Sequence, residues 1–245
     1  MLMSSGVRVI GVSRSPEIMD ADDSLYTPMR VDLSDRRALP KTLDALFTAN
    51  PEIDLVINNA GFGILDYFEA LSDEQIEMQY AVMLEAPTLI AARAVRAFGA
   101  NGLRGCLVNV SSLAAELPLP LMPVYNVCKA GLSALSESLV LDGSKHGAEY
   151  YVIDFRPGDF NTNFADRMEG RVEWQGVDLR EVMDRHHAEA PGVELAVAGL
   201  RKALLSGRSG RVRAGDFFQA KIAPLGPRLL PSALLRRIIR WYYKA

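Results

Sequence analysis

Residues 106–112 read Cys-Leu-Val-Asn-Val-Ser-Ser, and residues 125–129 read Tyr-Asn-Val-Cys-Lys. The first stretch is apolar and rich in valine, which predicts a buried strand that ends in the hydroxyls of Ser111 and Ser112. The second begins thirteen residues after Ser112 and opens a long helical pattern. Residues i and i+4 lie on one face of a helix, so we expect the side chains of Tyr125 and Lys129 to lie one above the other.

A phenol next to an ammonium group indicates acid–base chemistry. We expect the charge of Lys129 to favour the ionised form of Tyr125 and to lower its pKa from about 10. Such a phenol exchanges a proton with an alcohol or carbonyl oxygen near neutral pH, while the hydroxyl of Ser112 holds that oxygen. The Tyr-x-x-x-Lys pair alone is weak evidence, because the same spacing is common on solvated helix faces.

Strand and helix patterns alternate along most of the chain. We expect strands at 7–13, 29–32, 55–58, 107–110 and 151–155, and helices at 34–49 (capped by Ser34), 73–97 and 123–146. This spacing predicts βαβ units and a doubly wound, three-layer, Rossmann-like α/β fold with a parallel sheet. The polar stretch 161–190 is ambiguous, and we interpret it as mobile helices over a ligand crevice.

Polar or small residues follow four of the predicted strands, namely Asp32, Asn58-Asn59, Ser112 and Pro157-Gly158. The carboxyl ends of parallel strands lie at one edge of a sheet, and ligands of such folds bind beyond that edge. The coincidence therefore predicts one crevice that contains all four segments.

The composition is that of an ordinary globular protein, with 49% hydrophobic and 23% charged residues in 245. Two cysteines are too few for a disulfide framework, so reduced thiols in the cytoplasm are the default expectation. Three histidines without clustered cysteines or carboxylates predict no metal site. We find no apolar run of eighteen residues that would span a bilayer, and residues 1–5 are too short and uncharged for a signal peptide.

Charge is distributed unevenly along the chain. Residues 201–245 hold eleven Lys or Arg and one acid, Asp216, whereas the first 200 residues hold sixteen bases and twenty-nine acids. Residues 231–244 alternate paired apolar and paired basic residues, which predicts an amphipathic helix. Three interpretations remain open for it: contact with a membrane surface, a lid over an apolar pocket, and a contact between subunits.

With these motifs in order, the chain resembles the short-chain dehydrogenase/reductase (SDR) family over residues 6–215. The matching segments are Val12-Ser13-Arg14, Val31-Asp32-Leu33, Asn58-Asn59-Ala60-Gly61, Ser111-Ser112, Tyr125-x-x-x-Lys129, and Arg156-Pro157-Gly158 with Thr162. The resemblance implies a Rossmann-like domain at 1–215, followed by a basic amphipathic extension at 216–245. It also implies hydride transfer between a nicotinamide and a carbonyl or secondary alcohol. In that reaction Tyr125 is the general acid/base, Lys129 lowers its pKa and anchors the ribose, and Ser112 positions the oxygen.

The resemblance also implies a set of cofactor-binding residues: Ser13, Arg14, Asp32, Asn59, Ala60, Gly61, Lys129, Pro157, Gly158 and Thr162. NAD-preferring members carry an acid where Ser13-Arg14 stands, and a guanidinium suits a 2′-phosphate, so NADP(H) is favoured over NAD(H). Local alternatives stay open: a simple turn at 59–61, a helix-end charge at Asp32 and a helix cap at Thr162.

Family members with similar tails act on steroid-, retinoid- or lipid-like molecules, so a hydrophobic carbonyl or alcohol is the expected substrate. The resemblance suggests a homo-oligomer in the cytoplasm, with possible peripheral membrane contact through residues 231–245. We expect no nucleic-acid partner, because the basic residues cluster with bulky aliphatic ones and no readout motif is present. The alternative is a truncated, non-catalytic SDR-like binding protein.

The family's glycine-rich phosphate loop and the strand before it have no match here. Residues 1–6 resemble only the tail of the helix that follows that loop, a difference of about twenty residues. The unmatched strand is central in the family's sheet, between the strands that end at Ser13 and Asn58. We therefore expect both strands to expose unpaired edges, with weak NADP(H) binding and marginal stability. A longer natural product is favoured over a degenerate copy, because the rest of the site is kept.

A second departure lies in the helix expected at 73–97. The family's relay asparagine corresponds to Met83, and the glycine that usually follows corresponds to Ala86. A thioether cannot donate a hydrogen bond and accepts one only weakly. We expect slower proton exchange with solvent, unless Asn109 or a water takes over the relay.

Overall fold

The computed structural model describes residues 2–16, 24–100, 104–143, 150–164 and 166–244. Six parallel strands form two groups in the order β1-β2 and β3-β4-β5-β8, and β6 and β7 form a short antiparallel pair. The strands are β1 (Val9–Ser13), β2 (Tyr26–Arg30), β3 (Leu55–Asn58), β4 (Gly105–Val110), β5 (Tyr150–Pro157), β6 (Glu173–Trp174), β7 (Val177–Asp178) and β8 (Gly210–Ala214). The predicted α/β fold with a parallel sheet is confirmed.

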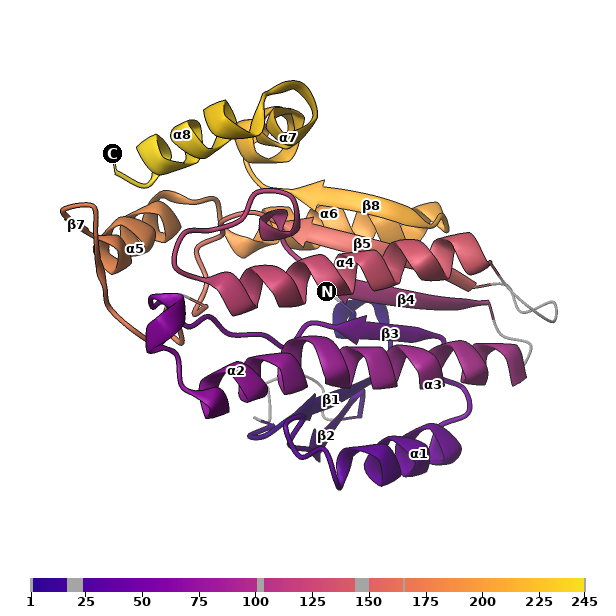
Figure 1. Cartoon of the computed structure of the whole chain (residues 1–245). Helices are drawn as coiled ribbons and strands as arrows, with labels where there is room; N and C mark the ends of the chain where they lie inside the picture. Colours follow the sequence, from indigo (N-terminus) through magenta and orange to yellow (C-terminus); the bar gives the residue numbers. More distant parts are fainter. Residues whose placement is uncertain (1, 17–23, 101–103, 144–149, 165, 245) are drawn as a thin grey trace.

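Helices cover both faces of the main sheet. They are α1 (Leu39–Ala49), α2 (Asp73–Tyr80), α3 (Ala86–Ala100), α4 (Pro123–Asp142), α5 (Leu179–Glu189), α6 (Val193–Ser206), α7 (Gly226–Leu229) and α8 (Ser232–Tyr242). In Figure 1, α3 and α4 lie in front of the sheet and α6 lies behind it. Successive residues of β4 point to opposite faces: Leu107 packs with Phe98 of α3, and Val108 packs with Ala203 of α6. A strand buried on both faces has to be apolar throughout, as residues 105–108 are.

The start of α1 differs from the prediction. We expected Ser34 to cap this helix, but the Ser34 hydroxyl instead donates to Asp32 Oδ1 at 2.6 Å. The backbone N–H groups of Arg37 and Ala38 bond to Asp35 Oδ1, each at 3.0 Å, and α1 begins only at Leu39. The prediction that Ser34 caps α1 is wrong because its hydroxyl is bonded to Asp32 instead.

The predicted helix at 73–97 is present and is longer than expected. Ser72 caps α2 in a reciprocal arrangement with Gln75, and the helical path continues to Ala100. Between α2 and α3, residues Ala81–Glu85 form a π-helix. Single π turns inside helices are rare and are frequent at functional sites.

The helix expected at 123–146 is α4, with Pro123 at its first position, where a missing N–H costs nothing. Its described part ends at Asp142, and residues 144–149 lie outside the described segments. In the stretch 161–190, the predicted helix corresponds to α5, and residues 173–178 form the β6–β7 pair instead.

The two groups of strands are not joined by backbone pairing. Among the described residues, β1 pairs with β2 and β3 pairs with β4, but no ladder connects β1 to β3. Both strands line a cavity between them, β1 with Ile10 and Val12, and β3 with Val56. The expectation of two open edges is confirmed. The β1–β2 pair is instead held to the rest through side chains, because Val12 of β1 and Met29 of β2 pack against a cluster formed by Val31, Leu39, Leu43 and Ala86.

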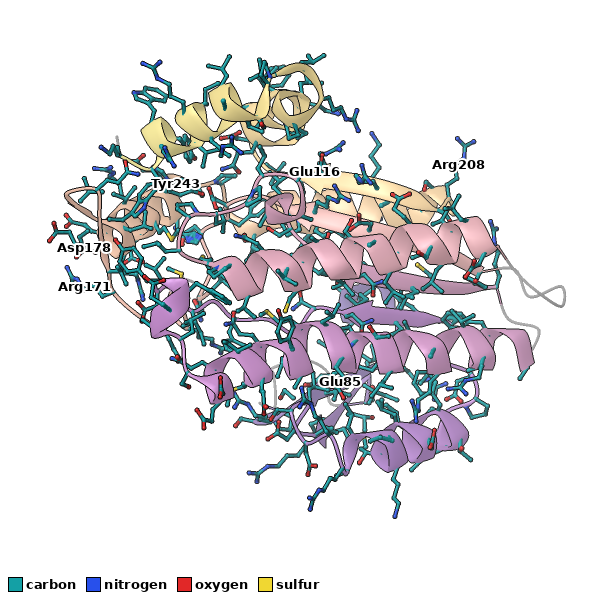
Figure 2. The ribbon with its side chains drawn as sticks, in the orientation of Figure 1. Glu85, Glu116, Arg171, Asp178, Arg208 and Tyr243 are labelled. Carbon is teal, nitrogen blue, oxygen red and sulfur yellow. The ribbon has the colours of Figure 1, made fainter. Side chains whose placement is uncertain are left out.

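Residues 216–244 follow β8 and pass back over the carboxyl ends of the strands. Figure 1 shows α7 and α8 at the outer edge of the molecule. Tyr243 is buried in the same apolar cluster as Tyr125. Figure 2 shows Tyr243 between α8 and the body of the protein. No helix in the described part of the chain has the length and apolarity needed to cross a membrane.

Candidate active site

All twelve site residues predicted from the sequence line one cavity of about 2530 Å³. They are Ser13, Arg14, Asp32, Asn59, Ala60, Gly61, Ser112, Tyr125, Lys129, Pro157, Gly158 and Thr162. The cavity lies beyond the carboxyl ends of the strands and extends between β1 and β3. Segments more than a hundred residues apart in sequence therefore meet at one edge of the sheet.

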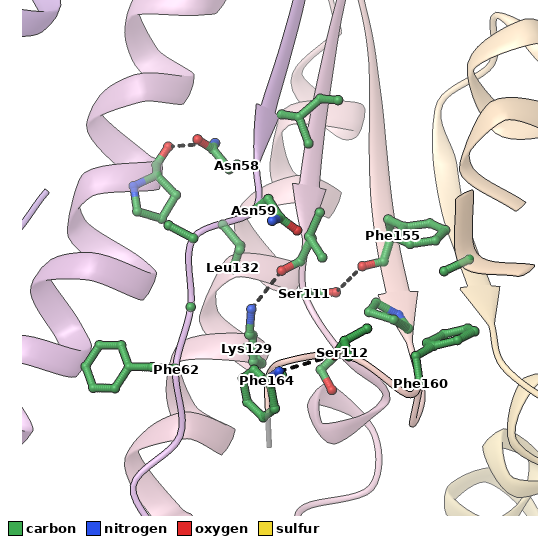
Figure 3. Close-up of a pocket in the computed structure, with 18 of the residues that line it drawn as sticks. Asn58, Asn59, Phe62, Ser111, Ser112, Lys129, Leu132, Phe155, Phe160 and Phe164 are labelled. Carbon is green, nitrogen blue, oxygen red and sulfur yellow. Dashed lines mark hydrogen bonds between the residues drawn. The ribbon is translucent and has the colours of Figure 1, made fainter. Parts of the chain in front are cut away.

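Ser112, Tyr125 and Lys129 are positioned by the end of β4 and the first turns of α4. Ser112 is in extended conformation just after β4, and its hydroxyl accepts from the Ala114 N–H at 3.0 Å. Tyr125 and Lys129 are only 7% and 4% exposed. The Lys129 ammonium donates to the Val110 carbonyl at 2.8 Å, a bond drawn as a dashed line in Figure 3. It also lies 5.6 Å from the centre of the Tyr125 ring. The expected stacking of Tyr125 and Lys129 on one helix face is present.

The protonation of the pair differs from the prediction. Burial raises the pKa of Tyr125 to about 12; the nearby Ser112 side chain acts in the opposite direction, and the charge of Asp159 adds to the rise. Burial likewise lowers the pKa of Lys129 to about 8. The expectation that Lys129 lowers the Tyr125 pKa is therefore wrong for this structure, because desolvation of the phenolate outweighs its neighbours. At neutral pH Tyr125 is a protonated phenol, able to donate.

At the β1–β2 end of the cavity, Ser13 closes β1 and Arg14 follows it. The Val31 N–H bonds to the Ser13 carbonyl at 2.9 Å, which brings Asp32 to the same edge. Hydrogen bonds from Ser34 lower the pKa of Asp32, and the charge of Arg14 adds to this effect. Arg14 and Asp32 thus both line the cavity at this edge.

Residues 59–61 pass between the two ends of the cavity. A Cβ atom added to Gly61 would lie 3.4 Å from Lys129 Nζ and 3.5 Å from Met83 Sδ. The backbone after β3 is therefore in contact with both the ammonium and the π-helix. Thr162 Oγ1 accepts from the Phe164 N–H at 3.4 Å within a turn, and no described helix begins there, so Thr162 is not the helix cap that the local alternative anticipated.

The side chains of Met83 and Asn109 are both buried. Met83 is buried within the π-helix and belongs to the same apolar cluster as Tyr125. The Asn109 side chain accepts from Asn58 Nδ2 at 2.8 Å and donates to Ser136 Oγ at 2.9 Å. The hydrogen bonds that the buried Asn109 amide forms with described residues lead to Asn58 and Ser136 and not to Tyr125 or Lys129, so its part in a proton relay stays a prediction.

A buried ionic network beneath the site was not anticipated. Arg156 donates to Asp154 Oδ2 at 2.8 Å and also bonds to Glu116 and Ser133. Ser133, one turn after Lys129 on α4, donates to Asp154 Oδ2 at 2.7 Å, and Ser111 bonds to the same carboxylate. The network therefore joins the end of β4 to α4 below the three candidate catalytic residues. The alternation of Asp154 and Arg156 in an otherwise apolar strand was the available signal, because i and i+2 share a face.

A second unanticipated contact connects the C-terminal segment to the end of β5. Gln219 donates to Asp159 Oδ2 at 2.6 Å, and the Asp159 N–H bonds back to Gln219 Oε1 at 2.9 Å. A Cβ atom at Gly158 would lie 2.2 Å from Gln219 Oε1, so a glycine is needed for this approach. His187 Nε2 lies 3.8 Å from Asp159 Oδ1. No short-range sequence pattern links residues sixty positions apart.

Residues 1–172 match the model of the short chain dehydrogenase family. The chain belongs to the short-chain dehydrogenase family. Among its relatives is the L-xylulose reductase of Mus musculus, 32% identical over 194 residues that make up 77% of this chain and 71% of the relative. A 3-ketodihydrosphingosine reductase of Bacteroides thetaiotaomicron is 28% identical over 166 residues, which make up 68% of this chain. The chain spans 60% of that protein's length, and 58% of an uncharacterized oxidoreductase of Schizosaccharomyces pombe.

Solved structures show the same fold. A short-chain dehydrogenase from Streptomyces avermitilis superposes with a TM-score of 0.75 at 21% identity, covering 99% of this chain and 90% of the other. One from Sphingobium yanoikuyae, in complex with NADPH, has a TM-score of 0.64 at 21% identity and covers 88% and 74% of the two chains. A 4-hydroxyisoleucine dehydrogenase was solved with NADH, with a TM-score of 0.66 at 17% identity and coverage of 87% and 88%. Both nicotinamide cofactors therefore occur among proteins of this fold.

Proposed function

We propose that this short-chain dehydrogenase transfers a hydride between NADP(H) and a hydrophobic carbonyl compound or secondary alcohol. The observation that supports this most is the convergence of Ser112, Tyr125 and Lys129 in one cavity with the segment 59–61. A proton donor, a hydroxyl and a buried cation beside a small-residue backbone are the groups that carbonyl reduction needs.

The protonated phenol of Tyr125 is suited to donate a proton to a substrate carbonyl. With its pKa raised to about 12 by burial, the Tyr125 phenol keeps its proton at neutral pH and can give it to a substrate oxygen. The hydroxyl of Ser112 holds the same oxygen. The nicotinamide supplies the hydride when it is bound. Lys129, fixed to the Val110 carbonyl, places its charge beside the phenol and offers N–H donors toward a ribose.

The proposed cofactor is NADP(H) because of the charge at the end of β1. Arg14 and Asp32 both line the cavity there, and a guanidinium is a natural partner for a 2′-phosphate. In this proposal Asp32 contacts the adenine, residues 59–61 pass along the cofactor, and Pro157, Gly158 and Thr162 lie near the nicotinamide. The open edges of β1 and β3 leave the pyrophosphate without the usual glycine-rich turn in the described residues, so we expect weak affinity.

A hydrophobic substrate is proposed from the apolar lining beside Tyr125. Phe164 lies 5.9 Å from the Tyr125 ring, and Leu119, Met183 and Ile239 line the same part of the cavity. The named substrates of relatives include both a sugar and a long-chain ketone. The apolar side chains of this lining suit the chain of the long-chain ketone, although His187 and Asp159 also line the cavity.

We place the enzyme in the cytoplasm as a homo-oligomer, with a domain at 1–215 and an extension at 216–245 in peripheral contact with a membrane.

The second candidate function is a non-catalytic binding protein, which the open gap between β1 and β3 favours. Two experiments test the proposal, each on this chain and on a chain extended upstream. The first is a titration with NADPH and with NADH, followed by nicotinamide fluorescence. The second measures NADPH consumption in the presence of long-chain ketones. NADPH binding with ketone-dependent consumption by the extended chain supports the enzyme. Binding of neither cofactor to either chain contradicts it.

A further inference from the structure

Helix α8 presents three stripes along its length. Leu235 and Ile239 face the body of the protein, and Ile239 packs against the apolar cluster that contains Tyr125. Leu234, Ile238 and Trp241 recur at helical spacing and are 45%, 41% and 68% exposed. Next to this exposed apolar stripe lies a basic one, which consists of Arg236, Arg237, Arg240 and Lys244. We call these seven residues of the two exposed stripes the α8 surface.

The cations of this region have no anionic partners in the described part of the chain. Lys221, Arg228, Arg236, Arg237, Arg240 and Lys244 are all exposed, and none forms an ion pair with a described residue. Residues 216–244 contain a single acid, Asp216. Some arginines elsewhere do form ion pairs, such as Arg36 with Glu85 at 2.7 Å and Arg93 with Asp44 at 2.8 Å, whereas other exposed cations, such as Arg37 and Lys41, form none with a described residue. What distinguishes residues 216–244 is that six such cations lie close together in the sequence with one acid.

Apolar exposure continues from α8 to the mouth of the cavity. Leu229 of α7 is 72% exposed, and Leu229 and Ile238 both line the cavity that contains Tyr125. Leu234 and Trp241 do not line it and belong to the outer side. Figure 2 shows side chains of α8 projecting away from the rest of the molecule at its outer edge. One apolar surface thus runs from solvent to the cavity entrance.

This arrangement matches the chemistry of an anionic bilayer surface. An apolar stripe inserts between lipid headgroups, while flanking arginines keep their guanidinium groups at the phosphate level and bury their aliphatic stems. Tryptophan favours the same interfacial depth. A site for an acidic protein would not need Leu234, Ile238 and Trp241 exposed together beside four cations.

We propose that the α8 surface docks onto bilayers that contain anionic phospholipids. Docking places Leu229 and Ile238, and with them the mouth of the cavity, against the lipid. A long-chain ketone then enters the cavity from the bilayer without crossing water; only this last step rests on the proposed function. The docking itself does not depend on cofactor or activity.

Vesicle flotation tests the docking. The full chain is mixed with vesicles of phosphatidylcholine alone, or of phosphatidylcholine with phosphatidylglycerol, and is floated at low and high salt. We expect flotation with the anionic vesicles only, weakened by high salt. The variants Leu234→Ser/Ile238→Ser/Trp241→Ser and Arg236→Ser/Arg237→Ser/Arg240→Ser should each lower the bound fraction roughly tenfold or more. All of these side chains are exposed or lie at the surface, so folding should be kept, and circular dichroism checks it.

Matched controls lie at other parts of the molecule. Leu141→Ser removes an 84% exposed leucine at the end of α4, and Arg37→Ser/Lys41→Ser removes two exposed cations near and on α1. Both should float like the parent chain. Equal flotation with neutral vesicles, no flotation, or unchanged flotation of the α8 variants would overturn the proposal. So would a dimer that α8 variants dissociate in sedimentation without any vesicle binding. NADPH consumption measured on the same samples shows separately whether the enzymatic function stands.

Discussion

Lys129 Nζ donates a hydrogen bond to the Val110 carbonyl at 2.8 Å, which ties the catalytic face of α4 to the last residue of β4. Val110 precedes Ser111 and Ser112, so one bond fixes the distance between the candidate proton donor and the candidate oxygen-binding hydroxyl. Lys129 is 4% exposed, and its ammonium has no carboxylate among its described partners. The site thus keeps an isolated buried charge, which is costly for stability and useful for chemistry.

Replacing Lys129 by Met should stabilise the protein at pH 7 and abolish its activity. Burial lowers the folded pKa of Lys129 to about 8. Between that pH and about 10.5, the unfolded side chain holds a proton that the folded one has lost, so stability rises with pH across the window. Denaturant unfolding from pH 7 to 10 should show a flatter dependence in Lys129→Met than in the parent. If the unfolding free energies of the two proteins depended on pH in the same way, Lys129 would not have a lowered pKa in the folded state.

Arg14→Ser should lower the preference for NADPH over NADH by roughly tenfold or more, because a charge-assisted contact with a phosphate is worth about 1.5–3 kcal/mol. The measurement is the ratio of dissociation constants for the two cofactors. Arg37→Ser is the control, since it removes an exposed cation that does not line the cavity. Equal loss of affinity for both cofactors would indicate general electrostatics rather than recognition of a 2′-phosphate.

Arg156→Met should destabilise the fold by about 3–5 kcal/mol, because it leaves the buried carboxylate of Asp154 without the guanidinium that hydrogen-bonds to it, whereas Glu116 keeps Arg213. Denaturant midpoints measure the change. Arg8→Met is the matched control: its pair with Glu52 is largely exposed, so its loss should cost at most about 1 kcal/mol. Similar effects of the two substitutions would contradict the role given to the buried network.

Gly158→Ala should destabilise the contact between the C-terminal segment and β5, because the new methyl group would meet Gln219 Oε1. Combining it with Gln219→Ala removes the obstacle, so the double variant should be less destabilised than the two single effects would add up to. A double-mutant cycle on unfolding free energies measures this coupling. Strict additivity would mean that Gln219 does not occupy the space beside Gly158.

The sequence predicted β1, β3, β4, β5 and the cavity well because their signals are local, whereas β2 begins three residues before the expected strand at 29–32 and β8 was not predicted. Valine-rich runs such as residues 106–110 can be buried only between two helical layers, and the polar residues that follow them must then lie at one edge. The open edges of β1 and β3 were also predictable, since a missing partner strand is visible from the order of motifs.

What the sequence could not predict depends on burial and on distant partners. The direction of the Tyr125 pKa follows from desolvation, which the i, i+4 spacing to Lys129 does not reveal. The bond between Gln219 and Asp159 joins positions sixty residues apart. Ser34 resembled a helix cap until the structure showed its hydroxyl bonded to Asp32.

Tyr125→Phe tests the central claim, that the buried phenol provides the proton for carbonyl reduction. The substitution removes one oxygen from a buried ring and should leave the fold and NADPH affinity unchanged. Steady-state NADPH consumption with a long-chain ketone should fall by roughly 10²–10⁴-fold relative to the parent chain. Undiminished consumption by Tyr125→Phe, with cofactor binding intact, would contradict the account.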